Sequence, residues 1–276
     1  MRNTTKITAA VLATGALTLG LTACGSDKAD TKAKASDPLV VAASPVPHAE
    51  ILDYVKDHLA KKAGLNLEVK EFTDYVTPNT ATQDGSVDAN YFQNQPYLDD
   101  FNKKNGTDIV PVVTVHLEPL GLYSSKVKSA DDLKKGATVA VPNDTVNEGR
   151  ALKLLDANGI ITLKGGAGNS ATPADIAKNP KGLKFKEVEA AQTARSLQDV
   201  DAAVVNGNYA IEADLKPAKD ALVLESTKNN PYSNFLAVKK GNEDDPRVKK
   251  LAKLLTSPEV KKFIADKYDG SVLASF

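Results

Sequence analysis

Short apolar runs alternate with amphipathic stretches along most of the chain. Residues 39–43 (LVVAA) are continuously apolar, which predicts a buried strand. Beyond the turn residues 44–47, the apolar side chains at 52, 55 and 59 recur at helical spacing, and we expect this helix to end near Gly64. Apolar positions 65, 67 and 69 then alternate with polar ones, which is typical of a second strand.

The same alternation continues to the C-terminus. Further strands are predicted over residues 109–115, 137–141, 202–205, 222–224 and 235–238. Helices are predicted over residues 78–84, 147–157 and 248–255, and from 258 onward. Ser257 is expected to be the N-cap of the last helix and Pro258 its first residue. The alternation of strands and helices favours α/β layers with largely parallel sheets.

A short internal echo suggests two similar halves. The tripeptide Val-Asp-Ala occurs at 87–89 and again at 200–202, each time before an asparagine-containing segment. Because ligands of open α/β sheets bind at the carboxyl ends of strands, this placement fits two lobes that face one cleft. The stretch from 37 to 276 is also long for a single compact unit. We therefore expect two lobes.

The first residues have the pattern of an export signal. Two positive residues, Arg2 and Lys6, precede the uncharged stretch 7–21, which is too short and too rich in small residues for a membrane span. It ends in Leu21 of the motif Leu-Thr-Ala-Cys, which is similar to a bacterial lipobox, where a signal peptidase cuts before the cysteine and lipid is attached to its sulfur. Residues 1–23 are thus expected to be a signal peptide. Cys24 is the only cysteine, so it has no disulfide partner within the chain.

Composition adds to this picture of an anchored protein. Residues 24–37 are polar and poor in apolar side chains, which predicts a flexible tether after a lipidated, for example palmitoylated, Cys24. Thirty-five basic residues balance 35 acidic ones, and this zero net charge argues against nucleic acid as a partner. We expect a protein held at the cell membrane by lipid and facing outside the cytoplasm.

Residues 143–150 (NDTVNEGR) are the first candidate binding segment. Thr145 and Glu148 have the spacing of a capping box, which predicts the start of a helix whose free N–H groups suit an anion. Arg150 lies early in that helix and could form a bidentate pair with a carboxylate. The alternative is an ordinary surface arginine beside a helix cap.

Clustered aromatic residues and asparagines are the second candidate. Aromatic residues are only 5% of the chain, yet they gather in 72–75 and 91–97. Rings beside amides suit a ligand with an apolar tail and a polar head, including a thioether, although core packing would give the same pattern. Asparagines in 206–208 and 229–234 could bind ammonium and carboxylate groups, although most asparagines at such positions are turn residues.

Other chemistry is disfavoured. The glycine-rich run 165–168 lacks both the P-loop ending and the dinucleotide fingerprint, so it is interpreted as a plain loop, with Thr172 available to cap a helix from Pro173. The three histidines, at 48, 58 and 116, include no closely spaced ligand pair, which argues against a zinc carrier. No nucleophile elbow or paired acid–base motif is found. We expect a protein that is not an enzyme and has no cofactor or metal.

Six blocks, in order, resemble the MetQ/NlpA-type lipoproteins, the methionine-binding components of ABC importers. The blocks are 44–51 (SPVPHAEI), 71–79 (EFTDYVTPN), 87–98 (VDANYFQNQPYL), 141–152 (VPNDTVNEGRAL), 201–210 (DAAVVNGNYA) and 230–238 (NPYSNFLAV). The resemblance covers the chain from Leu39 to its end. It implies a type 2-like, two-lobed periplasmic-binding-protein fold with the ligand between the lobes. It also implies docking onto a membrane permease that is driven by a cytoplasmic ATPase.

The resemblance assigns roles to individual residues. An aromatic pocket for the ligand side chain is implied by Tyr75, Phe92 and Tyr97, and Arg150 matches the arginine that grips the carboxylate. Asn206 and Asn234 match the amides that hold the amino-acid head group. Asn94 and Asn208 complete the expected site. The full set is Tyr75, Phe92, Asn94, Tyr97, Arg150, Asn206, Asn208 and Asn234.

One position departs from the family pattern. The family commonly has a histidine where this chain has Asn94, which still forms hydrogen bonds but is shorter and does not titrate near neutral pH. L-methionine is the expected ligand. A methionine-containing dipeptide, a methionine derivative, and a surface-interaction lipoprotein without a transport role remain as alternatives.

The expected lobes close over the ligand. Lobe 1 is expected to comprise residues 38–117 and 230–276, and lobe 2 residues 118–229. Linkers near 116–119 and 225–232 would let the lobes open and close. The body is expected to be monomeric.

Overall fold

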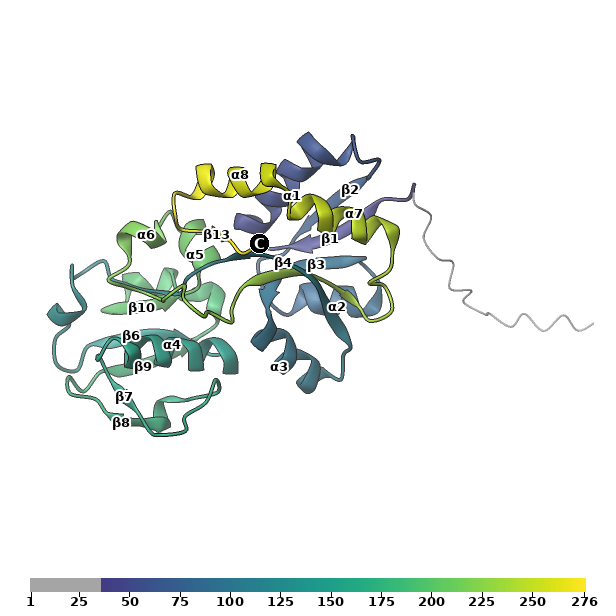
Figure 1. Cartoon of the computed structure of the whole chain (residues 1–276). Coiled ribbons are helices and arrows are strands. Elements are labelled where there is room, and N and C mark those ends of the chain that lie inside the picture. The colour runs from purple at the N-terminus through teal and green to yellow at the C-terminus, as the bar shows by residue number, and fades with distance from the viewer. Residues whose placement is uncertain (1–35) are drawn as a thin grey trace, which may run out of the picture. The chain divides into compact units, whose positions relative to one another are not determined.

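The computed structural model describes residues 36–276, which form an α/β body with two sheets (Figure 1). The predicted signal peptide, Cys24 and nearly all of the predicted tether lie outside the described residues. Within residues 36–276, no helix is long and apolar enough to cross a membrane.

Six strands form the first sheet, in the order β13-β4-β12-β3-β1-β2. Their bounds are β1 (Leu39–Ala43), β2 (Leu67–Glu71), β3 (Ala89–Asn94), β4 (Ile109–Leu117), β12 (Asn234–Lys239) and β13 (Leu273–Ala274). Strand β1 pairs in parallel with β2 and β3, while β12 is antiparallel to both β3 and β4. The half of the fold built on this sheet is called lobe 1 below.

Five strands form the second sheet, in the order β11-β5-β10-β6-β9. Their bounds are β5 (Gly121–Tyr123), β6 (Thr138–Pro142), β9 (Lys184–Val188), β10 (Ala202–Val205) and β11 (Val223–Leu224). The short strands β7 (Thr162–Leu163) and β8 (Ile176–Lys178) pair separately. The half of the fold built on the second sheet is called lobe 2. Residues 118–120 and 225–233 connect the strands of the two sheets.

Most strands of each sheet run in one direction, as expected, but both sheets are mixed because a few strands run against the rest. In lobe 1, β12 returns from far along the chain and inserts between β3 and β4, antiparallel to both. In lobe 2, β5 is antiparallel to β10 and β11, while β6 is parallel to β9 and β10. An apolar run predicts a strand but carries no information on its direction, so these returning strands could not be predicted from the pattern.

Helices cover both faces of the first sheet. In Figure 1, α1, α7 and α8 lie above the strands and α2 and α3 lie below them. The helices of lobe 1 are α1 (Glu50–Val55), extended by η1 (Pro45–Ala49) and η2 (Lys56–Ala60), α2 (Thr77–Asp84), α3 (Gln95–Asn105), α7 (Pro246–Leu255) and α8 (Pro258–Tyr268). Lobe 2 contains α4 (Thr145–Ala157), α5 (Gly207–Glu212), α6 (Pro217–Asp220) and the short turns η3 (Ala130–Asp132), η4 (Pro173–Asp175), η5 (Ala190–Gln192) and η6 (Arg195–Gln198).

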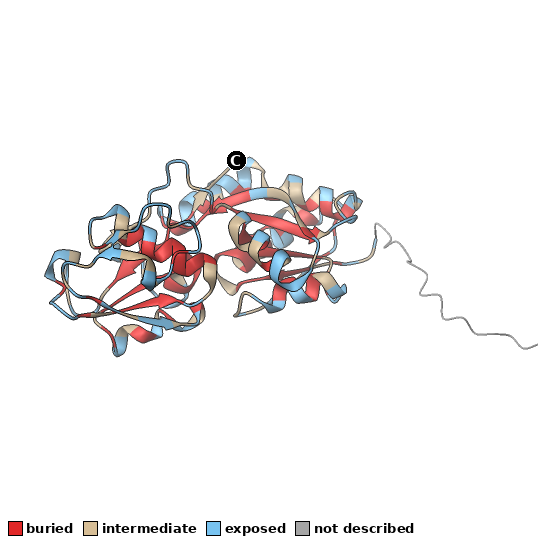
Figure 2. Ribbon diagram, turned by 90° about the horizontal axis from the view of Figure 1, so that it is seen from below, coloured by how far each residue is buried: buried red, intermediate tan, exposed pale blue. Residues whose placement is uncertain are grey.

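Each lobe has its own hydrophobic core. Side chains of β1, α1, α7 and α8, including Leu39, Leu52 and Leu251, are completely buried together in lobe 1. Side chains of β6, α4 and β10, including Val139 and Leu155, form a separate core in lobe 2. Figure 2 shows the buried residues concentrated on the strands of both sheets. The expected two-lobed fold is therefore confirmed.

Candidate functional site

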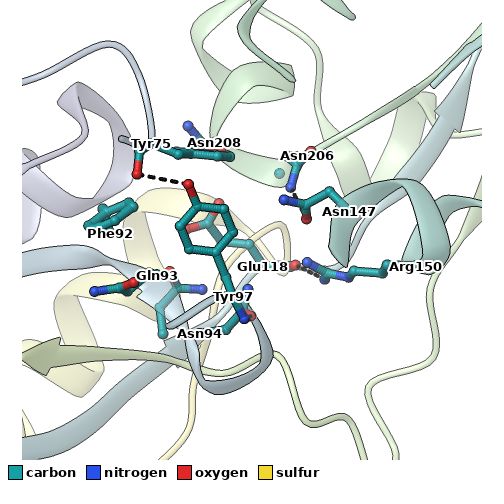
Figure 3. Close-up of a pocket in the computed structure, with 12 residues that line it drawn as sticks. Tyr75, Phe92, Gln93, Asn94, Tyr97, Glu118, Asn147, Arg150, Asn206 and Asn208 are labelled. Carbon is teal, nitrogen blue, oxygen red and sulfur yellow. Dashed lines mark hydrogen bonds between the residues drawn. The ribbon is translucent and has the colours of Figure 1, made fainter. Parts of the chain in front are cut away.

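A pocket with about 350 Å³ of empty space is lined by side chains of both lobes. Its lining is Tyr75, Phe92, Gln93, Asn94, Tyr97, Glu118, Asn147, Arg150, Asn206, Gly207, Asn208 and Asn234. All eight residues expected to contact a ligand are in this set, so the structure brings them together. Four lining residues were not among those expected, namely Gln93, Glu118, Asn147 and Gly207. Figure 3 shows the rings on one side, Asn147, Asn206 and Arg150 on the other, and Glu118 between them.

Three rings form an apolar wall on the lobe 1 side. Phe92 comes from the buried strand β3, Tyr97 from the first turn of α3, and Tyr75 from the loop before α2. Their ring centroids are 5.8 to 6.0 Å apart. Burial raises the pKa of the Tyr75 hydroxyl well above its usual value, so this group is neutral at physiological pH. The wall suits an unbranched apolar chain or a thioether.

Hydroxyl groups on the same side connect the lobes. The Tyr75 hydroxyl donates to Asn208 Oδ1 of lobe 2 at 2.5 Å. In the opposite direction, the hydroxyl of Tyr209 in α5 donates to the Thr73 carbonyl of lobe 1 at 3.0 Å. The Tyr97 hydroxyl stays within lobe 1 and donates to the Tyr75 carbonyl at 2.9 Å. Tyr75 therefore belongs both to the pocket wall and to the contact between the lobes.

Arg150 in α4 is buried, which excludes the alternative of a surface arginine. Its Nε donates to Glu225 Oε1 at 2.9 Å and its Nη2 to Glu225 Oε2 at 2.6 Å. The same Nη2 donates to the Glu118 carbonyl at 3.0 Å, and the guanidinium lies 4.1 Å from the centroid of the Tyr232 ring. Burial acts to raise the pKa of Glu225, but its bonds with Arg150 outweigh burial and lower it. These bonds use Nε and Nη2, so Nη1 is the guanidinium nitrogen left for a ligand.

The start of α4 corrects the predicted capping box. Asp144, not Thr145, is the N-cap, and its Oδ1 accepts a hydrogen bond from the Asn147 backbone N–H at 2.9 Å. Asp144 and Thr145 are both good N-cap residues, and the sequence alone does not decide between neighbours of this kind. The carboxylate of Asp144 therefore takes one of the N–H groups at which an anion was expected. Thr172 is the N-cap of the short turn that begins at Pro173, as predicted, and its N–H donates to Asp175 Oδ2 at 2.9 Å.

Two asparagines of lobe 2 present unpartnered atoms. Asn206 follows β10, and its Nδ2 donates to Asn147 Oδ1 at 2.9 Å. Among residues 36–276, the buried atoms Asn206 Oδ1 and Asn208 Nδ2 have no hydrogen-bond partner. A buried polar atom without a partner is costly, so an acceptor and a donor of this kind mark places where a bound molecule would form hydrogen bonds.

Asn94 has a structural role besides lining the pocket. It ends β3, and its Oδ1 accepts a hydrogen bond from the Tyr97 backbone N–H at 3.2 Å, which caps α3. Asn94 is 7% exposed. The side-chain oxygen of this residue is thus engaged by the protein, and its amide nitrogen is the group available for other contacts.

A buried polar cluster lies beside the pocket and was missed in the sequence. His116 Nε2 lies 2.7 Å from Glu118 Oε1, and His48 Nε2 lies 3.2 Å from the same oxygen. His48 Nε2 is also 3.1 Å from Asn234 Oδ1, and His116 Nδ1 contacts the Tyr91 hydroxyl. Burial lowers the pKa of His48 to about 4 and that of His116 to about 3, so both rings are neutral at pH 7.

This cluster weakens the argument against a metal site that was made from the spacing of the histidines in the sequence. The ligand atoms of His48, His116 and Glu118 all lie within 4.8 Å of one another, a grouping that could hold a metal ion. Spacing along the chain detects ligands on one helix or loop, whereas these residues come from η1, from β4 and from the connection that follows β4. The fold alone brings them together.

The chain is similar to known proteins along its whole described body. The model of the NlpA lipoprotein family matches residues 39–276. The chain is 46% identical to the methionine-binding lipoprotein MetQ of Bacillus subtilis, over 92% of this chain and 93% of that protein. It is 43% identical to the D-methionine-binding lipoprotein MetQ of Escherichia coli, over 90% and 91%.

A solved structure adds the same likeness in three dimensions. A nutrient-binding protein from Burkholderia cenocepacia, bound to methionine, is 51% identical and superposes with a TM-score of 0.84. The likeness covers 86% of this chain and 100% of that one. A family match across the whole folded body, relatives above 40% identity and a shared two-lobed fold agree, and the chain belongs to the NlpA lipoprotein family.

Proposed function

We propose that this protein captures methionine outside the cytoplasm and delivers it to an ABC importer. The observation that carries the proposal is the pocket itself, in which a wall of three rings in lobe 1 faces Arg150 and unpartnered amides of lobe 2. An α-amino acid with a long apolar side chain matches this division of chemistry. The methionine named for the B. subtilis and B. cenocepacia relatives supports the choice of ligand.

In the proposed complex, the thioether chain lies against Tyr75, Phe92 and Tyr97, with Asn94 beside them. The ligand carboxylate takes the free donors of Arg150, while Asn206, Asn208 and Asn234 hold the head group. Of these contacts, the one to Arg150 is expected to contribute most to affinity, because a charged hydrogen bond in a buried site is stronger than a neutral one.

Lobe closure is proposed to follow from the position of Arg150. Its guanidinium bonds to Glu118 in one connection between the lobes and to Glu225 in the other. The two connections also bond to each other, because Glu225 N–H donates to the Leu120 carbonyl at 2.8 Å. A ligand held by Arg150 would therefore be linked, through this side chain, to both connections between the lobes. We propose that the connections bend near 116–119 and 225–232, so that residues 118–229 rotate relative to residues 38–117 and 230–276.

Anchoring and delivery complete the proposal. A lipid on Cys24 is proposed to hold the protein at the outer side of the membrane, and the polar segment up to residue 37 to let the body reach its permease. The permease, driven by a cytoplasmic ATPase, is the proposed receiver of the ligand. The role is capture and release by a monomer, without catalysis.

A thermal unfolding experiment tests this function. The purified lipoprotein, freed of carried-over ligand by unfolding and refolding, is heated with L-methionine, D-methionine, Gly-Met, methionine sulfoxide or leucine. A ligand at one hundred times its Kd should stabilise the folded protein by about 2.7 kcal/mol. The largest shift is expected with L-methionine. If only Gly-Met or methionine sulfoxide raises the unfolding temperature, that compound replaces methionine as the proposed ligand. If none of the compounds raises it, the proposal is overturned.

A further inference from the structure

We propose that Glu118 is the group that recognises the ligand's ammonium, and that His48 and His116 hold its carboxylate in place. The protein would then select solutes with a free, positively charged amino group. This inference rests on the proposed function, because it assumes that an amino acid enters the pocket. Glu118 was not among the residues expected from the sequence.

Glu118 is the acidic residue of the pocket lining. It is 6% exposed and lies between the ring wall and Arg150 (Figure 3). An amino acid carries one positive and one negative group, and the lining holds one guanidinium and one carboxyl group. If the ligand carboxylate binds Arg150, Glu118 is the lining group of opposite charge to the ligand ammonium.

The histidines orient this carboxyl group through one of its oxygens. A neutral imidazole has one N–H donor and one acceptor nitrogen. An ionised Glu118 can only accept, so Nε2 of His116 carries the N–H that is directed at Glu118 Oε1, and Nδ1 of that ring then accepts from the Tyr91 hydroxyl. Nε2 of His48 faces two oxygens, Glu118 Oε1 and Asn234 Oδ1, and therefore carries the N–H of its ring. His116 Nε2 donates to Glu118 Oε1, while the N–H of His48 donates to Asn234 Oδ1 and lies 3.2 Å from the same carboxylate oxygen.

Gly207 shows that the approach of Glu118 to lobe 2 is close. A Cβ atom at Gly207 would lie 2.7 Å from Glu118 Cβ and 3.1 Å from Oε2. The backbone N–H of the next residue, Asn208, stabilises the ionised carboxylate. A side chain at position 207 would displace Glu118, so the glycine is required where the connection between the lobes passes the start of α5.

The pKa of Glu118 is raised above its ordinary value, chiefly by burial. Burial raises its pKa, while His48, Arg150 and the Asn208 N–H act to lower it. The other titratable groups around it are His116 of β4, Tyr75, Tyr91 of β3 and Tyr268 of α8. A ligand ammonium favours the ionised form, so binding below the raised pKa must release a proton, and affinity must fall as the pH falls.

The first test removes the charge from each partner in turn. Calorimetry measures the affinity of the purified lipoprotein for L-methionine and for 4-(methylthio)butanoate, which is methionine without its amino group. Wild type should prefer L-methionine by roughly ten- to a hundredfold. Glu118→Gln keeps the shape of the side chain and should lose most of this preference, whereas Glu259→Gln, at an exposed glutamate of α8, should keep it.

The outcomes separate the two proposals. If wild type binds neither compound, the proposed function fails. If wild type binds L-methionine but the preference is the same in Glu118→Gln, only the role of Glu118 is overturned. The comparison of the two ligands on unmodified protein also stands by itself, because equal affinities would contradict ammonium recognition without any variant.

The second test concerns the histidines and uses the pH profile of L-methionine affinity. Removing the His116 donor with His116→Gln, or its hydroxyl partner with Tyr91→Phe, should move the acid fall in affinity to higher pH. Glu118→Gln should abolish the fall, and His58→Asn, at an exposed histidine, should leave it unchanged. Weaker binding at every pH with no shift of the profile would mean that His116 only supports the fold, and would overturn its positioning role.

A metal-free control addresses the other chemistry of this cluster. The profile is measured again after dialysis against EDTA. If the pH profile of L-methionine affinity is unchanged, the Glu118 carboxylate is held by the histidine N–H donors, as proposed. A lost profile that returns with added zinc would mean that a metal ion, not the histidine N–H groups, positions Glu118, and would overturn the inference.

Discussion

At the residue scale, the most informative side chain is Arg150, because its surroundings decide how it can bind a ligand. Its bidentate partner is Glu225 of the same chain, and Tyr232 covers its guanidinium. A ligand carboxylate would therefore join an existing buried ion pair. Removing only one partner of such a pair lowers the stability of the fold most, because the other charge is left buried and uncompensated.

Arg150→Ala should accordingly lose both binding and stability. We expect about 3–5 kcal/mol of lost stability, because Glu225 remains buried without its partner, and L-methionine affinity should fall at least a hundredfold. The double variant Arg150→Met with Glu225→Gln should recover stability but not affinity. Arg195→Ala, at an exposed arginine of lobe 2, is the control. Chemical denaturation and calorimetry measure the two effects, and near-normal affinity in Arg150→Ala would remove this residue from the site.

Gly149, the neighbour of Arg150, provides a test of packing. A Cβ atom there would lie 2.1 Å from the Asn169 carbonyl oxygen, so alanine must displace the backbone of that loop. Although alanine favours a helix, Gly149→Ala should lower the free energy of unfolding by about 1–3 kcal/mol. Gly165→Ala, where a Cβ meets nothing within 4 Å, should be close to neutral. A stable Gly149→Ala protein in a thermal melt would contradict the close approach.

The sequence predicted the pocket residues well at this scale, but only through family resemblance. Taken alone, Asn206 and Asn234 were indistinguishable from turn residues. Glu118 and Glu225 were missed, because both lie in connections that have no hydrophobic period and no motif. Their importance follows from contacts with His116 and Arg150, which only the folded chain forms.

At the element scale, strands with apolar sequences were predictable and the polar one was not. Residues 39–43 and 202–205 were predicted as strands and are β1 and β10. Strand β3 was missed, although all six of its residues are buried, because it contains three amides. Two of these, Asn90 and Gln93, bond to Asn79 of α2. Such a buried amide network satisfies polar groups inside the fold and leaves no periodic signal.

Helix α4 contains a carboxyl group that should make stability depend on pH. Burial, with Glu187 and Asp144 nearby, raises the pKa of Glu148 to about 7 from its ordinary value of 4.5. The folded protein therefore binds more protons than the unfolded chain between these values. The resulting stability is present below the ordinary pKa and is lost as pH rises through the raised one.

Glu148→Gln should remove this dependence. At pH 8 the variant should be more stable than wild type by roughly 1–2 kcal/mol, and at pH 5 the two should be nearly equal. Glu187→Gln should reproduce part of the effect, because it removes one of the two nearby charges. Urea denaturation at both pH values measures it. If Glu148→Gln is less stable than wild type at pH 8, the ionised form is not the destabilising one.

At the scale of the whole molecule, the order of motifs predicted two lobes and a shared pocket, whereas the direction of the returning strands and the contacts between lobes could not be predicted. Those contacts depend on residues far apart in the chain. The hydroxyls of Tyr75 and Tyr209 reach across the lobes in opposite directions, and their rings are 5.0 Å apart. Two such bonds make the loop around Tyr75 a clamp that can form only when the lobes are together.

The clamp should determine how long a ligand stays bound. Tyr75→Phe keeps the ring of the pocket wall and removes the bond to Asn208, while Tyr97→Phe keeps its ring and removes a bond within lobe 1. One net hydrogen bond is worth about 0.5–1.5 kcal/mol, so Tyr75→Phe should release L-methionine roughly two- to thirteenfold faster. Tyr209→Phe should behave like Tyr75→Phe, since it also breaks a bond between the lobes. Stopped-flow release rates would contradict the clamp if Tyr97→Phe were as fast as the other two, because closure would then not depend on which lobe the hydroxyl reaches.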